Sequence, residues 1–258
     1  MQLNTIHTAN CLDWMAQIAN GSVHLVVADP PYFRVQLQHE WDNQWPDEAA
    51  YLDWSMQWLR EAMRALVPGG LLYVFGQVGK REHVWMHLQS RACAEFGFHD
   101  LIIWDRAVGY NERRDSFTPA YEMILVFCKA GASPRFDKDA VREAYDQKTQ
   151  AIYLKDARYK NLEARREHLK RGKYATNVWR IPSLKGSSKE KLGHPTQKPL
   201  ALIERLIASS SREGDVVFDP FCGSGTTLFA AKKHKRDYLG IEINAEYADL
   251  ARRRLENL

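Results

Sequence analysis

The sequence has little of what would place a protein in a membrane or an oxidising compartment. No apolar run approaches the roughly 18 residues that a membrane-spanning helix needs, and the polar first residues lack the charged and apolar regions of a secretory signal. Four cysteines are scattered without a Cys-x-x-Cys pair: Cys11, Cys93, Cys128 and Cys222. We therefore expect neither a zinc site nor a disulfide framework, and we predict a cytoplasmic protein with reduced thiols.

Several common ligand-binding signatures are also missing. The glycines at 223 and 225 are not followed by the third glycine of the dinucleotide fingerprint, and no Walker lysine pattern accompanies them. Phosphates are therefore not expected as ligands. His83 and His87 lie one helical turn apart, but the run between them lacks the glutamate of a zinc-protease helix. No metal site is expected.

What the chain does contain is typical of a globular α/β protein with one basic segment. Hydrophobic residues make up 45% and charged residues 26% of the 258 residues, which allows one large domain with a sizeable core. Strand-like and helix-like segments alternate, and this predicts a mixed, mostly parallel sheet with helices on both faces. The predicted strands are 3–10, 24–28, 71–75, 100–104, 121–128, 215–218 and 238–243, and the predicted helices include 47–66, 81–96, 161–173 and 200–209.

The alternation breaks at residues 131–182, which are polar and basic. Between Lys129 and Lys173 there are 13 Lys and Arg against 7 Asp and Glu, a net charge of +6, so the rest of the chain carries −2 of the total of +4. This block indicates either a local nucleic-acid surface or an ordinary solvated helical face. Residues 34–46 form a polar loop that suits either a mobile lid or a simple surface loop.

A strand that ends in two prolines is the first candidate site. Residues 24–28 predict a buried strand, which Asp29-Pro30-Pro31-Tyr32 ends because proline fixes φ and lacks a backbone donor. Asp29 and the Pro30 carbonyl can accept the two N–H groups of an amine on a flat ring, while Tyr32 stacks on the ring. The alternative is a plain Pro-Pro loop in which Asp29 caps a helix or forms a turn.

A glycine turn between a strand and a helix is the second candidate site. Gly223 and Gly225 allow the backbone to approach a ligand closely, and Thr226 opens a helix with exposed N–H groups. Glu242 lies 17 residues after Gly225, at the end of the next predicted strand, where an acid can bond ribose hydroxyls. The alternative is a strand-end acid without a ligand. A turn with few charges suits the methionine end of S-adenosylmethionine.

Both candidate sites resemble motifs of one enzyme family, over a similarity that runs from about residue 6 to residue 258. Asp29-Pro30-Pro31-Tyr32 resembles the catalytic motif of the S-adenosylmethionine-dependent DNA amino-methyltransferases, which modify adenine N6 or cytosine N4. Residues 219–226 resemble their cofactor-binding motif, and residues 194–199 (His-Pro-Thr-Gln-Lys-Pro) resemble the motif that closes over the methionine. Because the catalytic motif comes first, the order resembles the β group, in which the fold is circularly permuted.

The resemblance implies a Rossmann-like catalytic domain of residues 1–130 and 183–258, with 131–182 as a target-recognition insertion. The catalytic residues would be Asp29, Pro30, Pro31 and Tyr32. The contacts with S-adenosyl-L-methionine would come from Cys11, Asp29, His194, Thr196, Lys198, Asp219, Phe221, Gly223, Ser224, Gly225, Thr226 and Glu242.

The resemblance also implies the reaction, which is site-specific methylation of adenine N6 in double-stranded DNA. The target amine is inaccessible inside a duplex, so the base would be flipped out. Aspartate before Pro-Pro favours adenine over the N4 amine of cytosine; an RNA substrate and an inactive nucleic-acid-binding relative are further alternatives. DNA contacts are expected from Arg113, Arg114, Arg165, Arg166, Lys170 and Arg171. We further expect a role in restriction–modification, association with the nucleoid, a homodimer and no membrane partner.

Overall fold

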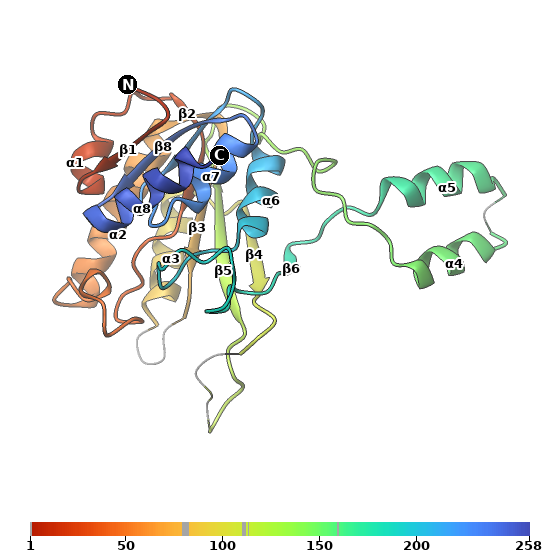
Figure 1. Cartoon of the computed structure of the whole chain (residues 1–258), viewed down its shortest axis with the longest axis horizontal. Helices are drawn as coiled ribbons and strands as arrows, with labels where there is room; N and C mark the ends of the chain where they lie inside the picture. The colour runs from red at the N-terminus through yellow and green to blue at the C-terminus, as the bar shows by residue number, and fades with distance from the viewer. Residues whose placement is uncertain (1, 79–82, 110–111, 113, 159) are drawn as a thin grey trace.

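A computed structural model describes residues 2–78, 83–109, 112, 114–158 and 160–258. Its centre is one eight-stranded sheet of order β1-β8-β7-β2-β3-β5-β4-β6 (Figure 1). The strands are β1 (Thr5–Thr8), β2 (Val23–Ala28), β3 (Leu66–Gly76), β4 (Asp100–Asp105), β5 (Tyr121–Cys128), β6 (Val178–Arg180), β7 (Val216–Asp219) and β8 (Asp237–Glu242). The strand β5 runs antiparallel to its neighbours β3 and β4, and the other pairings in the sheet are parallel. The predicted mixed, mostly parallel sheet is confirmed.

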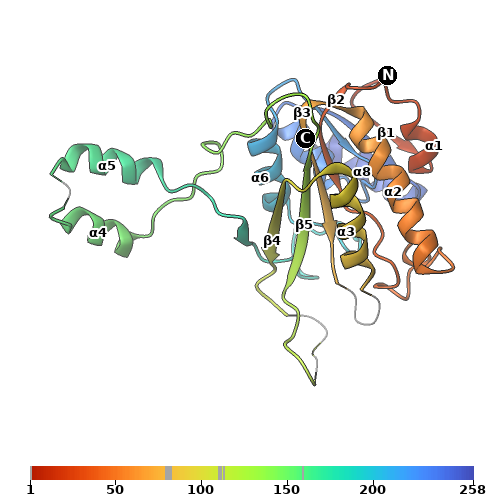
Figure 2. The same cartoon turned by 180° about the vertical axis from the view of Figure 1, so that it is seen from behind.

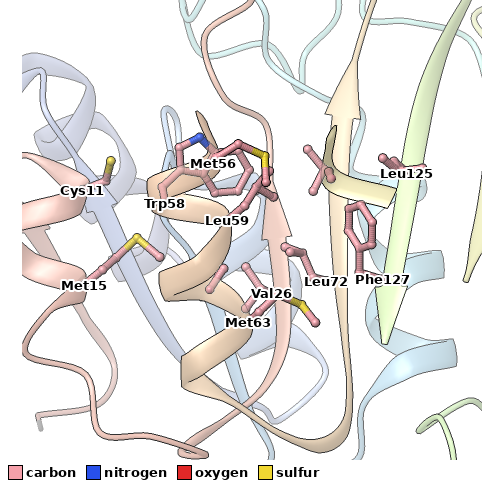
Figure 3. Close-up of a cluster of buried hydrophobic side chains, with 14 of the residues drawn as sticks. Cys11, Met15, Val26, Met56, Trp58, Leu59, Met63, Leu72, Leu125 and Phe127 are labelled. Carbon is pink, nitrogen blue, oxygen red and sulfur yellow. The ribbon is translucent and has the colours of Figure 1, made fainter. Parts of the chain in front are cut away.

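Helices cover both faces of the sheet because the strand side chains alternate between two buried clusters. Val26 and Leu72 point into a cluster with α1 (Cys11–Met15), α2 (Glu48–Ala65) and α3 (Val84–Phe96), which Figure 3 shows from close by. Val27 and Tyr73, one residue further along, point into the opposite cluster. That cluster contains side chains of α6 (Leu200–Ser210), α7 (Thr226–Lys233) and α8 (Ala245–Glu256). No helix in the described ranges is long and apolar enough to cross a membrane.

The strand β3 begins earlier than the sequence pattern predicted. The predicted helix ended at residue 66 and the predicted strand began at residue 71, but α2 ends at Ala65 and β3 starts directly at Leu66. Gly69 has a φ of +77°, which favours glycine. A Cβ at Gly70 would lie 2.9 Å from the His24 carbonyl oxygen, so glycine here permits the close approach of β2. The glycines thus shape the start of the strand.

A helical hairpin extends away from the sheet on the far side of β6 (Figures 1 and 2). It consists of α4 (Gln147–Lys155) and α5 (Leu162–Arg171). The helix α5 was predicted, whereas α4 has no buried residue and so gave no apolar period to recognise. The strand β6 pairs with β4, so residues 178–180 belong to the sheet. The segment that leaves the sheet is therefore shorter than the predicted insertion 131–182.

The topology brings three strand ends together at one edge of the sheet. The strands β2, β7 and β8 are parallel neighbours, so their carboxyl ends lie on the same side of the sheet. Asp29 directly follows β2, Asp219 is the last residue of β7 and Glu242 is the last residue of β8. Ligands of open α/β sheets bind at the carboxyl ends of parallel strands. This edge therefore carries the candidate site.

Candidate active site

The Asp-Pro-Pro-Tyr turn after β2 is fixed by hydrogen bonds from two tyrosines. The Tyr32 hydroxyl donates to Asp29 Oδ1 at 2.6 Å, and the Tyr51 hydroxyl on α2 donates to the Pro31 carbonyl at 2.9 Å. Burial, together with the carboxylates of Asp29 and Glu122, raises the pKa of Tyr32 well above its ordinary value. The Tyr32 hydroxyl therefore keeps its proton and remains a donor to Asp29. These two hydrogen bonds hold both ends of the turn.

The second oxygen of Asp29 is bound by a lysine from the segment before α6. Lys198 Nζ lies 2.6 Å from Asp29 Oδ2 and 3.5 Å from Glu122 Oε2. Burial opposes the charge of Lys198, but the two carboxylates outweigh it, so the pKa of Lys198 lies above its ordinary value. Lys198 was predicted to contact the cofactor. Its ammonium lies against the catalytic turn, where both carboxylates converge on it, and Lys198 also lines the cavity, so the cofactor contact stays a prediction.

The glycine turn after β7 is held by the acid at the end of β8. The Gly223 N–H donates to Glu242 Oε2 at 2.8 Å, and the Asn244 N–H donates to Glu242 Oε1 at 2.9 Å. Gly223 has a φ of +50°. A Cβ at Gly223 would lie 3.1 Å from His194 Nε2, so the turn and the His194 segment are in close contact.

One cavity joins the two motifs. The predicted site residues that line it are Cys11, Asp29, Pro30, Pro31, Tyr32, His194, Thr196, Lys198, Asp219, Phe221, Gly223, Ser224, Thr226 and Glu242. Gly225 was predicted to contact the cofactor but does not line the cavity. A Cβ on Gly225 would lie 2.8 Å from Ala251 Cβ, so this glycine permits the close packing of α8. Asn10, the N-cap residue of α1, and Tyr247 of α8 complete one wall of the cavity.

His194 and Asp219, which both line the cavity, also have strongly shifted pKa values. Burial lowers the pKa of His194 to about 4, and its ring packs edge-on against Tyr247 at 4.4 Å between centroids. The neutral imidazole is therefore the form present at pH 7. Burial raises the pKa of Asp219 to about 7, with Asp29 and Glu242 adding to the shift. Asp219 Oδ1 accepts the Phe221 N–H at 3.0 Å, which fixes the start of the glycine turn.

The loop at 34–46 borders the cavity and is organised around one buried acid. Asp42 Oδ2 accepts the N–H groups of Val35 and Gln36 at 2.9 and 2.6 Å, and burial raises the pKa of Asp42 to about 6. The loop thereby brings Trp41 and Gln44 to the cavity wall. It is a structured loop with a short 3₁₀ turn at Glu40–Asp42.

The predicted DNA-contacting residues lie away from the cavity and differ in exposure. Arg166, Lys170 and Arg171 on α5 are exposed, as is Arg114 between β4 and β5. Arg165 is buried, and its guanidinium lies 4.5 Å from the centroid of the Tyr153 ring of α4. The prediction that Arg165 contacts DNA is therefore not supported, because this side chain packs inside the hairpin. Arg113 lies outside the described residues.

Two charged residues beside the catalytic turn also carried no specific prediction. Glu122, near the start of β5, and Arg106, after β4, form an ion pair with a distance of 3.2 Å between Arg106 Nη1 and Glu122 Oε1. Glu122 is the only acid in an otherwise apolar strand, Tyr-Glu-Met-Ile-Leu-Val-Phe-Cys. A buried carboxylate needs a partner, so this lone acid was a usable signal of a polar cluster.

The sequence matches the DNA methylase family of N6 and N4 methyltransferases over residues 23–253. This range contains the catalytic turn, the hairpin and the glycine turn. The chain belongs to this family and is a DNA methyltransferase. The predicted class of enzyme and its methyl donor, S-adenosyl-L-methionine, are thereby confirmed.

Individual relatives are similar over nearly the whole chain. The type II methyltransferase M1.MboII of Moraxella bovis is 32% identical over 256 residues, which cover 97% of this chain and 96% of the relative. The DNA adenine methyltransferase YhdJ of Escherichia coli (strain K12) is 31% identical over 258 residues, which cover 99% of this chain and 83% of the relative. The structure of TTHA0409 from Thermus thermophilus, complexed with S-adenosyl-L-methionine, superposes with a TM-score of 0.64 at 28% identity. The match covers 98% of this chain and 94% of TTHA0409.

Proposed function

We propose that this DNA methyltransferase modifies the N6 amine of adenine at a specific DNA sequence. The observation that carries the proposal is the shared cavity, in which Asp29 of the catalytic turn faces the same space as Gly223 and Glu242. The aspartate before Pro-Pro and the similarity to an enzyme named as a DNA adenine methyltransferase favour adenine over the N4 amine of cytosine.

The donor set of the glycine turn suits S-adenosyl-L-methionine. Of the ionisable side chains that line the cavity, Asp219 and Glu242 are acids at the glycine turn, whereas Asp29 is paired with Lys198. An acidic wall favours a ligand that carries a sulfonium cation and no phosphate. When bound, this group supplies an electrophilic methyl. Glu242 retains one lone pair on each oxygen beyond its two backbone bonds and would accept the ribose hydroxyls.

The catalytic turn would position the amine for in-line attack. Asp29 would accept one amine hydrogen and the Pro30 carbonyl the other, which directs the nitrogen lone pair toward the methyl. The same two oxygens would stabilise the positive charge that develops on nitrogen, and positioning alone can supply about 7–11 kcal/mol of barrier reduction. Tyr32 would contribute its ring face to the base, since its hydroxyl is already bonded to Asp29.

The position of Asp29 favours a target base that leaves the duplex. Its side chain is only 24% exposed and lies within the cavity, where a paired base cannot reach it. Flipping costs a few kcal/mol, which stacking on Tyr32 would partly offset. The hairpin of α4 and α5, with its exposed Arg166, Lys170 and Arg171, would hold the DNA backbone as part of the target-recognition segment. A homodimer stays a prediction.

Mass spectrometry of nucleosides tests the modified base directly. Unmethylated plasmid DNA, prepared in a host without DNA methyltransferases, would be incubated with the protein and S-adenosyl-L-methionine and then digested. We expect N6-methyladenine. If N4-methylcytosine is found instead, the proposed target base is wrong, but the proposed active site still stands. Methylation of total RNA but not of DNA would contradict the proposed substrate. An Asp29→Ala protein is the matched control, and it should leave the DNA unmodified.

A further inference from the structure

We propose that Lys198 and Glu122 are positioning residues for methyl transfer, which hold the Asp29 carboxylate in a fixed orientation toward the amine and paired with a cation. This inference rests on the proposed role of Asp29 as an acceptor of the amine hydrogens. It gives Lys198 a function different from the cofactor contact that the family motif suggested, and it brings a residue of β5 into the catalytic machinery.

The geometry places a donor on each oxygen of Asp29. Tyr32 Oη donates to Oδ1 and Lys198 Nζ to Oδ2, both at 2.6 Å. Each oxygen keeps one lone pair, so the carboxylate can still accept an amine hydrogen. With both oxygens bound, the carboxylate cannot rotate about its Cβ–Cγ bond without losing a charge-assisted hydrogen bond. Its remaining lone pairs therefore point in fixed directions.

Glu122 fixes the two donors in turn. Its Oε2 lies 3.3 Å from Tyr32 Oη and 3.5 Å from Lys198 Nζ, and its Oε1 pairs with Arg106. The Lys198 ammonium also lies 5.5 Å from the centroid of the Tyr32 ring and 5.2 Å from that of Phe75. The lysine is thus confined by two carboxylates and two aromatic faces. Segments from β2, β5 and the start of α6 meet at this point.

The cluster is buried and balanced in charge. The side chains of Lys198, Glu122 and Arg106 are 8%, 10% and 8% exposed, and two cations face two carboxylates when Asp29 is included. Removing one member of a buried ion cluster leaves an uncompensated charge. If Lys198 is removed, Asp29 and Glu122 face each other with Arg106 alone as a cation. A carboxylate that loses its cationic partner takes up a proton at higher pH, by about one to three pH units.

Other charged groups near Asp29 cannot replace Lys198. His194 faces Asp29 but is neutral at pH 7, because burial lowers its pKa to about 4. Asp219 and Asp42 also interact with Asp29, but both are acids, so neither can serve as its cationic partner. Among the described residues in contact with Asp29, Lys198 is the cation that pairs with its carboxylate.

The test is the dependence of methyl transfer on pH in four charge variants. Rates would be measured with tritiated S-adenosyl-L-methionine and unmethylated plasmid DNA, both saturating, from pH 5 to 9. We expect Lys198→Met to move the acid limb of the profile upward by about one pH unit or more, while Lys198→Arg keeps it near the wild-type position. Glu122→Gln should not move the limb upward. The acid limb of the double variant Lys198→Met/Glu122→Gln should lie between those of Lys198→Met and the wild type.

Controls separate this inference from simple loss of structure and from failure of the proposed function. Thermal unfolding and S-adenosyl-L-methionine binding would be measured for each variant, and Lys189→Met, an exposed lysine of the same segment, should keep the wild-type profile. If Lys198→Met does not fold, the double variant compared with Glu122→Gln carries the same test, with an upward shift expected. An unmoved acid limb, or equal shifts in Lys198→Met and Lys198→Arg, would overturn the inference. Full activity of Asp29→Ala would instead overturn the proposed function.

Discussion

The Gly223 N–H donates to Glu242 Oε2 at 2.8 Å, and this bond ties the glycine turn after β7 to the end of β8. Glu242 lies at the cavity wall, where burial raises its pKa. One carboxylate therefore both shapes the turn and faces the space where the methyl donor would bind. The turn and the acid act as one structural unit.

Replacing Glu242 should weaken cofactor binding. In Glu242→Gln, one carboxylate oxygen becomes an NH2 group that faces a backbone donor, so a buried hydrogen bond is lost at a cost of about 1–3 kcal/mol. We expect the Kd for S-adenosyl-L-methionine, measured by isothermal titration calorimetry, to rise by about tenfold or more. A Kd equal to that of the wild type would show that Glu242 does not hold the ligand.

Alanine at Gly223 should disturb the same turn through its backbone. Gly223 has a φ of +50°, and a Cβ there would lie 3.1 Å from His194 Nε2. Left-handed backbone costs a non-glycine residue about 1–2 kcal/mol. We expect Gly223→Ala to lower the melting temperature and to weaken S-adenosyl-L-methionine binding. The matched control is Gly186→Ala, where a Cβ would meet no atom within 4 Å, and the protein should melt like the wild type.

His194 should make the wild type lose stability relative to a variant without this histidine as the pH drops through the range in which His194 titrates. The pKa of His194 is lowered to about 4 from 6.5, so the unfolded chain binds a proton below about pH 6.5 while the folded chain does not until about pH 4. The contribution is complete above pH 6.5 and is lost between pH 6.5 and 4. This contribution to the free energy of unfolding is about 3 kcal/mol, because a change of one pKa unit corresponds to about 1.36 kcal/mol.

Urea unfolding of the wild type and of His194→Gln at pH 7.5 and pH 4 measures this contribution. We expect the free energy of unfolding to drop by about 3 kcal/mol more in the wild type than in the variant, since glutamine does not titrate. Equal drops would show that His194 is solvated rather than buried in the folded protein.

Charge removal on α5 should weaken DNA binding in a salt-dependent manner. Arg166, Lys170 and Arg171 are exposed, and each phosphate contact contributes about −0.9 to the slope of log K against log salt. We expect the triple alanine variant to flatten the slope by up to about 3. Arg60→Ala, on α2, removes a cation that pairs with Glu95 and should leave the slope unchanged. An unchanged slope in the triple variant would make these residues ordinary solvated charges.

Arg165→Ala should behave differently from its neighbours. Because its guanidinium packs on the Tyr153 ring within the hairpin, its loss should destabilise the packing of α4 on α5 rather than remove a phosphate contact. We expect faster amide exchange across α4 and α5 with a salt slope like that of the wild type. A loss of salt dependence without faster exchange would contradict the buried placement of Arg165.

Short motifs with a fixed local geometry were predictable from the sequence. Asp29 follows an apolar strand that the prolines end, and Gly223 follows a second apolar strand. Because these two strands pair in parallel, Asp29 and Gly223 lie at the same edge of the sheet. The antiparallel strand β5 and the early start of β3 at Leu66 were less predictable. They depend on tertiary contacts between distant segments.

Interactions between distant charged residues could not be predicted in the same way. Lys198 lies in a motif that suggested a cofactor contact. One of its carboxylate partners, Asp29, is 169 residues away along the chain, and the other, Glu122, lies on β5. Spacing along the chain carries no information about such a pair. Likewise, α4 and the burial of Arg165 depend on packing within a polar hairpin whose helices lack a strong apolar period.

The most direct test of the central claim is the single-turnover rate of methyl transfer by Asp29→Ala, measured alongside its affinity for S-adenosyl-L-methionine. If Asp29 accepts the amine hydrogen, the rate should fall by at least about 100-fold while cofactor binding persists. A rate equal to that of the wild type would contradict the proposed role of the Asp-Pro-Pro-Tyr turn.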